Sequence, residues 1–294
     1  YGSWMRKTIC VLTIKLFRRP VILHMHGGEF RKFYETKVGP LGRAGIRMIL
    51  RLVDAIIALS PEWAEFYLKL APKTRVTVIA NAVAIPPALS DARLLHVERW
   101  RIVCVGRLAE RKGTFDLLRA IGPLGDTVEL WLAGDGDLDL ARSLAHELGI
   151  SQRVELLGWI DADARASLLS GAHIFALPSH AEGLPMALLE AMSYGLPVIS
   201  TPVGGIPSLV ENEVNGILIG PRDVEALTTA IKQLTEDPKR ASRLGAAARK
   251  TIEERYDASA FRAKLHELHA EVAEKYLEQG RAAPAPRATA RERS

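Results

Sequence analysis

The chain has 294 residues, of which 48% are hydrophobic and 25% charged, and its formal net charge at pH 7 is +5. This composition is typical of a soluble globular protein, and the length allows two domains. The two cysteines, Cys10 and Cys104, lie far apart and form no CxxC pair, which excludes a disulfide framework and a zinc site with the usual ligand spacing. This cysteine usage makes a reducing cytosol the default, so we expect a cytoplasmic protein. No stretch approaches the roughly eighteen apolar residues that cross a bilayer.

The positive charge gathers at the start of the chain. Residues 1–53 contain eleven basic and two acidic side chains, a balance of +9 that leaves −4 for the remainder. Arg43, Arg47 and Arg51 recur every four residues on a segment whose other face is apolar, which is typical of a basic helix on an anionic membrane surface. A solvated helix face packed on a sheet explains the pattern at least as well. No recognised nucleic-acid-binding module accompanies the charge, so we expect no nucleic acid partner.

The first 80 residues alternate strand-like and helical patterns. They predict helices near 3–17, 41–52 and 61–70, and strands at Val21–Met25, Ala55–Leu59 and Val76–Ile79. Prolines interrupt residues 81–100, which we interpret as a linker. Because three strands are too few for a complete doubly wound half, residues 1–80 are interpreted as a partial N-terminal Rossmann-like domain.

The second part of the chain predicts a complete parallel sheet. Its strands are expected at Ile102–Val105, Val128–Ala133, Val154–Leu157, Ile174–Leu177, Val198–Ser200 and Ile217–Ile219, each separated by a helix. Such alternation favours the α/β class, with a complete Rossmann-like domain over residues 101–255. The pattern after Asp223 is helical to about Gln279, so a C-terminal helix is expected over 256–280, followed by a basic, low-complexity and disordered tail at 281–294.

Two glutamates eight positions apart mark a candidate site in "HAEGLPMALLEAMSYGLPVIST", residues 180–201. The segment predicts a loop that contains Glu182 and a helix from Pro185 to Tyr194 that contains Glu190. In a βαβ unit such a loop opens onto the ligand crevice, and the helix N-terminus offers free N–H groups to an anion. Because the helix is apolar nearly all round, Glu190 needs a partner. A core salt bridge at Glu190 and a solvated Glu182 form the simpler alternative.

A second candidate site lies in "VCVGRLAERKGTFDLLRAI", residues 103–121. A buried strand is expected to end at Gly106, and a short loop with Arg107, Arg111 and Lys112 leads to a helix that begins near Gly113. Cations at the carboxyl end of a strand, in front of a helix N-terminus, are suited to a phosphate group. An exposed basic turn is the alternative interpretation.

Taken together, these segments resemble a known family. Gly106-Arg107 with Lys112-Gly113, "AGDGD" at 133–137, "LLGWI" at 156–160 and the segment 178–219 with its E-x7-E spacing are similar to the donor domain of family 4 retaining glycosyltransferases. The resemblance covers residues 101 to about 255 closely, and "VILHMHGGEF" and "AIIALSPEW" extend it more loosely into the first part. It implies the GT-B fold, with an incomplete acceptor-side Rossmann-like domain over residues 1–80 and a nucleotide-sugar donor-binding one over residues 101–255.

The resemblance also implies an activity and assigns the leaving group's contacts. It implies transfer of a sugar, with retention, from a nucleotide-diphosphate sugar of UDP or GDP type to a glycan or lipid-linked acceptor in polysaccharide or cell-envelope biosynthesis. The enzyme would work in the cytoplasm at the inner face of a membrane. Arg107 and Lys112 would hold the diphosphate and neutralise the charge that grows as it leaves.

Further residue roles follow from the same resemblance. Glu182 would contact the transferred sugar, Glu190 would accept hydrogen bonds from the ribose hydroxyls, and His26 would lie beside the sugar while His24 would be structural. The resemblance assigns no nucleophile, no cofactor and no divalent metal, and the Asp-x-Asp at 135–137 is interpreted as a structural turn. It implies that the backbone N–H groups of Gly183 and Leu184 lie near the phosphate or sugar. The turn at Gly158-Trp159 would lie near the base.

The sequence departs from the family pattern at two places. The glycine-rich loop that members carry after their first strand has no counterpart here, which suggests that the opening βα units lie upstream of Tyr1. Residues 79–83 read Ile-Ala-Asn-Ala-Val where members usually have Pro-Asn-Gly, so we expect an altered hinge. A nucleotide-sugar-binding module without turnover is therefore the alternative function. A nicotinamide-dependent oxidoreductase ranks below both, because the G-x-G-x-x-G fingerprint is absent after the first strand.

Overall fold

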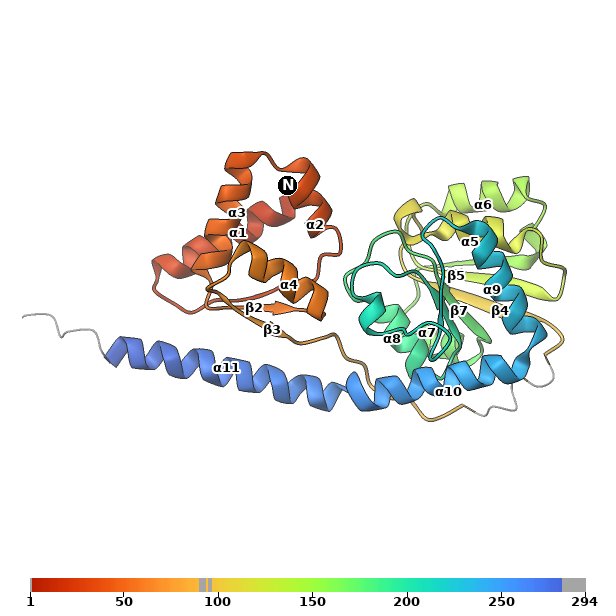
Figure 1. Ribbon diagram of the computed structural model, residues 1–294. Coiled ribbons are helices and arrows are strands. Elements are labelled where there is room, and N and C mark those ends of the chain that lie inside the picture. The colour runs from red at the N-terminus through yellow and green to blue at the C-terminus, as the bar shows by residue number, and fades with distance from the viewer. Residues whose placement is uncertain (1, 90–93, 95–96, 282–294) are drawn as a thin grey trace, which may run out of the picture.

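The computed structural model describes residues 2–89, 94 and 97–281, which form two lobes (Figure 1). The first lobe, residues 2–80, is built on a three-stranded sheet, and the second lobe, residues 100–255, on a six-stranded sheet. Every strand pair in both sheets is parallel. This arrangement confirms the predicted α/β class and the small number of strands in the first lobe.

The first lobe follows the predicted order of elements, with a short helical insertion after the first strand. The insertion, α2 and the π-helix η1, was not predicted, and the other boundaries differ by at most one residue. In chain order the elements are α1 (Gly2–Leu16), β1 (Ile22–His24), α2 (Phe30–Lys32), η1 (Phe33–Lys37), α3 (Pro40–Leu52), β2 (Ala55–Ala58), α4 (Pro61–Leu70) and β3 (Arg75–Val78).

The central strand β2 shows why this small sheet forms. All four residues of its Ala-Ile-Ile-Ala sequence are buried, so both faces of the sheet are covered. Ile56 packs in a cluster with side chains of α1, α3 and α4, while Ile57 packs in a second cluster with α11 (Ala258–Arg281). Because side chains alternate along a strand, one strand joins the two layers.

The second lobe is a doubly wound sheet. Its elements are β4 (Trp100–Val105), η3 (Glu110–Lys112), α5 (Thr114–Ile121), β5 (Val128–Ala133), α6 (Leu138–Glu147), η4 (Ser151–Arg153), β6 (Val154–Gly158), α7 (Ala162–Ser170), β7 (Ile174–Leu177), α8 (Met186–Ser193), β8 (Val198–Ser200), η5 (Ile206–Ser208), β9 (Ile217–Leu218), α9 (Val224–Glu236) and α10 (Pro238–Arg255). The strand order is β6-β5-β4-β7-β8-β9. The order reverses between β4 and β7, and ligands bind in the crevice beyond the carboxyl ends of strands at such a point.

Two predictions about helices need correction. The helix expected from Pro185 to Tyr194 is α8, Met186–Ser193, and Pro185 is its N-cap residue with an extended backbone (ψ 123°), so it precedes the helix. The helical region after Asp223 is divided into α9, α10 and α11, because Asp237 and Tyr256 leave the helical conformation and Asp237 caps α10 through its side chain. The expected disordered tail lies outside the described residues, except for Arg281, which ends α11.

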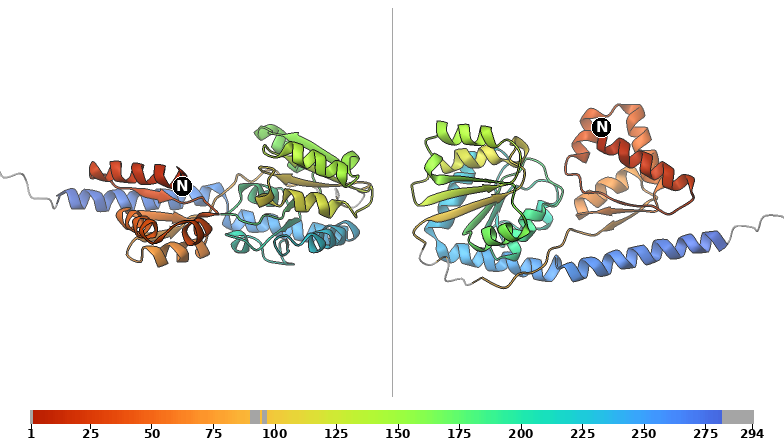
Figure 2. Two further views of the ribbon diagram at one scale, coloured as in Figure 1. Left: turned by 90° about the horizontal axis from the view of Figure 1, so that it is seen from above. Right: turned by 180° about the vertical axis from the view of Figure 1, so that it is seen from behind.

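The long helix α11 links the lobes. It continues from α10, which packs against the second lobe, and runs along the first sheet (Figures 1 and 2). Leu268 and Val272 of α11 are buried against Ala55, Ile57 and Ile79. Helix α11 therefore supplies the layer that the first sheet lacks on one face. The predicted domain boundaries at residues 80, 100 and 255 remain a prediction about independently folding units.

Candidate active site

A buried ion pair lies at the reversal point of the second sheet. The Nζ atom of Lys112, in the loop after β4, donates to Oε1 of Glu182, in the loop after β7, over 2.6 Å. The side chains of Lys112 and Glu182 are 17% and 7% exposed. The hydroxyl of Ser179 donates to the same carboxylate oxygen at 2.8 Å. The alternative of a solvated Glu182 is therefore wrong, because this carboxylate is buried and has two partners.

Two glycines allow the loops to approach one another this closely. Gly113 has φ +70°, and a Cβ atom there would collide with the carbonyl oxygen of Pro178. Gly204 has φ +60°, and a Cβ atom there would collide with the carbonyl oxygen of Glu182. Only glycine combines a positive φ with such close backbone contact at low cost. The position of Glu182 thus depends on the backbone of three separate loops.

Glu190 has a different environment, on α8. Its Oε2 atom lies 2.9 Å from Nε of Arg165 on α7. The structure therefore contains the salt bridge that the simpler alternative predicts for Glu190. Burial raises the pKa of the Glu190 carboxyl, and the nearby Arg165 guanidinium lowers it. A cavity of about 350 Å³ beside the pair is lined by residues of the linker, α7 and α8. The Glu190 side chain is 20% exposed beside this cavity.

The remaining predicted donor-site residues line the carboxyl ends of three neighbouring strands. The N–H of Gly106 donates to Ala133 O at 2.9 Å, and that of Gly134 donates to Gly158 O at 2.7 Å, so the ends of β4, β5 and β6 are joined edge to edge. Arg107, directly after Gly106, has a 64% exposed side chain that lies 3.8 Å from an Asp135 carboxylate oxygen. Its guanidinium remains available to a ligand.

Trp159 follows the Gly158 turn at this edge. Gly158 has φ +66°, and the Trp159 side chain is 77% exposed. An exposed indole at the edge of a crevice offers a flat apolar surface for a planar ligand group. Trp159 lies at this edge and is not part of the ion pair of Lys112 with Glu182. Its predicted role beside the base stays a prediction.

The first lobe contributes two histidines at the end of β1. The rings of His24 and His26 are 3.9 Å apart between centroids. Burial lowers the pKa of His24 to about 4, and burial together with the Lys7 ammonium lowers that of His26. Both imidazoles are thus neutral at pH 7, so each ring has one N–H donor and one acceptor nitrogen. The Nε2 atom of His24 is buried with no hydrogen-bond partner among the described residues.

The lobes touch beside His26. A Cβ atom on Gly183 would lie 2.8 Å from His26 O, and one on Gly28 would collide with the backbone of Glu182 and Gly183. The segment His26-Gly27-Gly28 therefore lies directly against the loop that holds Glu182. In addition, the N–H of Gly205 donates to Gly183 O at 2.6 Å.

Several residues of this region were missed by the sequence interpretation. Ser179 binds Glu182, and Asn81 Nδ2 of the linker donates to Leu184 O at 2.7 Å. The His180 ring lies 2.6 Å from Asp116 on α5, with both side chains buried. A signal existed for Asn81, because it keeps the asparagine of the family's Pro-Asn-Gly. None existed for the pairing of His180 with Asp116, which are 64 residues apart.

The structure thus brings most of the predicted site residues to one crevice. Gly183 lies against His26, the Glu182 backbone lies against Gly28, and Lys112 pairs with Glu182, while Arg107 follows β4. Glu190 and Trp159 stand apart from the buried ion pair, on α8 and after β6. A crevice with two cations, a buried carboxylate and neutral histidines is suited to an anionic ligand that carries hydroxyl groups.

Two protein-family models match the chain. The model for glycosyl transferases group 1 matches residues 88–251, and the model for Glycosyltransferase Family 4 matches residues 4–85. The first match spans more than half of the chain and includes every candidate residue of the second lobe.

Individual relatives are similar to the chain over part of their length. The chain is 31% identical over 227 residues to the lipopolysaccharide core biosynthesis glycosyltransferase LpsE of Rhizobium meliloti, covering 74% of this chain and 64% of that protein. It is 33% identical over 176 residues to the GDP-mannose-dependent alpha-(1-6)-phosphatidylinositol monomannoside mannosyltransferase of Mycolicibacterium smegmatis, covering 54% and 46%. The chain therefore spans less than two thirds of the length of these relatives.

Solved structures match the arrangement of both lobes. HepE from Anabaena, in complex with UDP and glucose, superposes with a TM-score of 0.76 at 23% identity, covering 89% of this chain and 74% of that one. Sucrose-phosphate synthase from Thermosynechococcus elongatus gives a TM-score of 0.76 at 25% identity, covering 86% and 68%. These matches confirm the GT-B fold. Because its two family matches together cover residues 4–85 and 88–251, the chain belongs to glycosyltransferase family 4.

Proposed function

We propose that the chain is a nucleotide-sugar-dependent, retaining glycosyltransferase that moves a sugar onto a glycan or lipid-linked acceptor in polysaccharide or cell-envelope biosynthesis. The observation that carries the proposal is the buried contact of Lys112 with Glu182 at the reversal point of the second sheet. An ammonium group has three N–H donors, and Glu182 and its loop orient one of them. The other two remain for the oxygens of a diphosphate.

In this proposal each group has a defined part in the reaction. Arg107 and Lys112 neutralise the diphosphate as the bond to the anomeric carbon breaks, which stabilises the charge that develops in the transition state. Glu182 contacts the sugar, and Glu190 leaves Arg165 to accept hydrogen bonds from the ribose. His26, neutral at pH 7, donates a hydrogen bond on the acceptor side of the sugar. Trp159 lies against the base.

Calorimetric titration with UDP, GDP and ADP tests the donor site. Arg107→Ala should weaken binding of the preferred nucleotide at least tenfold, because the side chain is available to the diphosphate. Arg142→Ala is the matched control, since Arg142 is 66% exposed and also pairs with an aspartate, Asp139. Equal affinity of both variants would contradict the assignment of Arg107.

The role of Glu190 has its own test. The wild type should bind UDP or GDP more tightly than the matching 2′-deoxynucleotide, and Glu190→Ala should bind both with the same affinity. A preference that survives in Glu190→Ala would remove Glu190 from the ribose site.

A second candidate is a nucleotide-sugar-binding module without turnover. The first sheet, with three strands against six in the second, favours it. Release of nucleoside diphosphate from UDP-sugar or GDP-sugar, measured with and without a glycan acceptor, decides between the two. Tight nucleotide binding without release would support the module, and transfer of sugar would exclude it.

We further propose that the first lobe contacts an anionic membrane surface at the inner face of a membrane. Helix α1 and the turn after it expose large apolar side chains beside Arg18 and Arg19, namely Met5, Ile9, Leu12, Leu16 and Phe17. No helix among the described residues has both the length and the apolar character needed to cross a bilayer. Of the arginines expected to face lipid, Arg43 donates to Tyr34 O and Val38 O, and Arg47 donates to the Tyr34 hydroxyl.

Those two arginines therefore serve the packing of η1, and the membrane contact is proposed for α1. Vesicles of phosphatidylglycerol should sediment the chain at low salt, whereas Leu12→Ser with Phe17→Ser should leave it in the supernatant. The control is Leu140→Ser, because Leu140 is 54% exposed on α6 of the second lobe. Equal sedimentation of all variants would exclude this face.

A further inference from the structure

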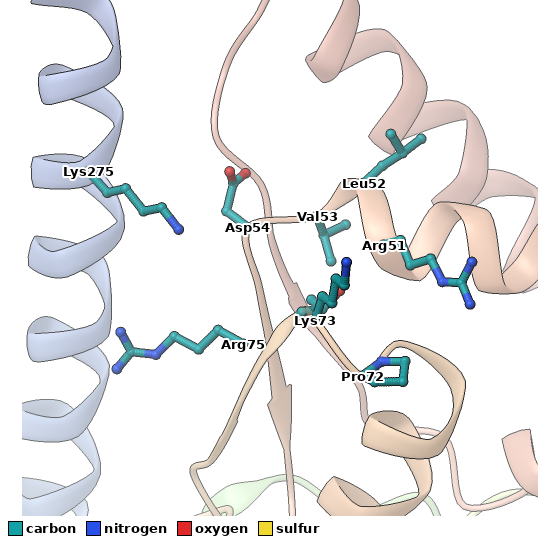
Figure 3. Close-up of a pocket in the computed structure, with 9 residues that line it drawn as sticks. Arg51, Leu52, Val53, Asp54, Pro72, Lys73, Arg75 and Lys275 are labelled. Atoms are coloured by element: carbon teal, nitrogen blue, oxygen red, sulfur yellow. The ribbon is translucent and has the colours of Figure 1, made fainter. Parts of the chain in front are cut away.

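A cavity of about 630 Å³ lies in the first lobe, outside the candidate active site. It is lined by the end of α3, the turn into β2, the loop from α4 to β3 and one residue of α11 (Figure 3). Asp54 and Arg75 stand at the amino ends of β2 and β3, while His26 follows the carboxyl end of β1. Since the strands are parallel, the cavity lies at the amino ends of the strands and the candidate active site at their carboxyl ends.

The cavity carries an excess of positive charge. Its charged lining residues are four cations and one carboxylate: Arg51, Lys73, Arg75, Lys275 and Asp54. The carboxylate is already occupied, because Asp54 Oδ2 accepts from Lys15 Nζ at 2.5 Å and from the backbone N–H of Val21 at 2.7 Å.

Among the residues that the structure describes, only one of the four cations has an ion-pair partner. Arg75 pairs with Glu271 on α11. Arg51, Lys73 and Lys275 have no ion pair within the described part of the chain. Cations at the ends of helices α3 and α4 stabilise the helix dipoles, which explains Arg51 and Lys73. That effect does not explain Lys275, which comes from a different helix, inside α11.

The volume of the cavity and the positions of these side chains indicate which ligand is suitable. In Figure 3, Lys275 extends from α11 toward Asp54 and Arg75 extends from β3 toward α11, while Arg51 lies on the far side of the cavity. The volume of about 630 Å³ leaves room for more than one phosphate group. We propose that the cavity binds a phosphorylated ligand with two anionic groups or one phosphate and a polar body, held by Lys73 and Lys275.

Such a ligand would join α11 to the loop before β3, three residues beyond the contact of Val272 with the first sheet. Its phosphate has two sources of the same chemistry, a soluble organic phosphate or a phospholipid headgroup. The proposal does not depend on sugar transfer, because none of its residues belongs to the crevice of Lys112 and Glu182.

Titration of the full chain with inorganic pyrophosphate at low ionic strength tests the site. The double variant Lys73→Ala with Lys275→Ala should lose at least tenfold in affinity. The control is Lys239→Ala with Lys250→Ala, which removes the same charge from exposed positions on α10. The variant Arg107→Ala with Lys112→Ala removes any binding at the donor loops and should keep the binding at this cavity.

Each result decides the proposal. Equal affinity of the Lys73 and Lys239 double variants, or complete loss of binding in the Arg107 double variant, would overturn it. The Lys73 and Lys275 side chains are exposed, so we expect the double variant to fold, and its unfolding midpoint should match that of the control.

A second arm separates the two sources. Sedimentation with phosphatidylcholine vesicles that contain phosphatidic acid should be weaker for the Lys73 double variant than for its control if the ligand is a headgroup. Equal sedimentation of the two variants, together with their difference in pyrophosphate affinity, would assign the cavity to a soluble phosphate. Any contact of α1 with the vesicles acts equally in both variants and cancels in the comparison.

Discussion

The two lobes differ in where they place charged and apolar side chains. At the crevice edge of the second lobe, the charges of Lys112 and Glu182 are buried and paired. The first lobe instead exposes apolar side chains on α1, and three of the four cations that line its large cavity have no ion pair among the described residues. A buried pair on a complete sheet forms a preorganised site, whereas exposed apolar groups and free cations mark surfaces that meet another molecule. The proposed donor site therefore depends on the second lobe, and the proposed contacts with further partners depend on the first.

The largest effect is expected from Gly204→Ala, which changes the backbone packing around Glu182 in the second lobe. The new Cβ atom would collide with the carbonyl oxygen of Glu182 and displace the loop. We expect loss of nucleotide binding and a decrease of about 3 kcal/mol in the free energy of unfolding, since overpacking adds to the cost of a positive φ. Gly149→Ala is the matched control, because Gly149 has φ +68° with open space around it, and it should cost only about 1 kcal/mol. Urea unfolding measures both, and equal costs would show that the close approach is unimportant.

A smaller effect is expected when the buried pair is broken. Glu182→Ala leaves the Lys112 ammonium without its carboxylate, and we expect the free energy of unfolding to fall by about 2 kcal/mol. The exposed pair of Lys250 and Glu254 provides the control, because Glu254→Ala should cost less than about 0.5 kcal/mol. In the double variant Glu182→Ala with Lys112→Ala the cost should be less than the sum of the single costs. Additive costs would mean that the two side chains act independently.

The first lobe should respond to pH through His24. Its pKa is lowered from 6.5 to about 4 in the folded chain, so between these values the unfolded chain binds a proton that the folded chain does not. Stability is therefore complete above about pH 6.5 and decreases as the pH falls toward 4. The ring is only half-buried, so solvent screening limits the change to about 1 kcal/mol.

His24→Asn should remove this part of the pH dependence. Urea unfolding at several pH values between 4.5 and 7.5, for the wild type and the variant, measures it. His146→Asn, at an exposed position on α6, is the control and should follow the wild type. A constant difference between His24→Asn and the wild type at every pH would contradict the prediction.

The smallest effect on stability is expected at Trp159. Its side chain is 77% exposed, so Trp159→Ala should change the free energy of unfolding by less than about 0.5 kcal/mol. Nucleotide affinity should nevertheless fall about fivefold, since stacking of a base on an aromatic ring contributes roughly 1 kcal/mol. Trp159→Phe should retain most of the affinity. If Trp159→Ala binds nucleotide as tightly as the wild type, the base lies elsewhere.

The sequence by itself determined the α/β class, the order of most strands and the two loops that carry Lys112 and Glu182. Periodicity and turn residues are local properties, and the six strands of the second lobe could be placed because each is a short apolar run between turn signals. The family motifs supplied the residue roles. The boundaries of short elements such as α2 and η1 were not predicted, because Arg43, from α3, satisfies carbonyl groups near η1.

Only the tertiary structure decided which charges are paired. Lys112 and Glu182 are 70 residues apart, and their contact depends on strand order, which joins β4 to β7. The same holds for Arg165 with Glu190, for Gly204 beneath Glu182, and for the cavity that Lys275 of α11 completes from the far end of the chain. A sequence pattern reports the preference of a residue for burial or exposure. A buried charge is stable only when an opposite charge or a hydrogen-bonding group lies beside it. That partner is set by packing between distant segments, which no local pattern contains.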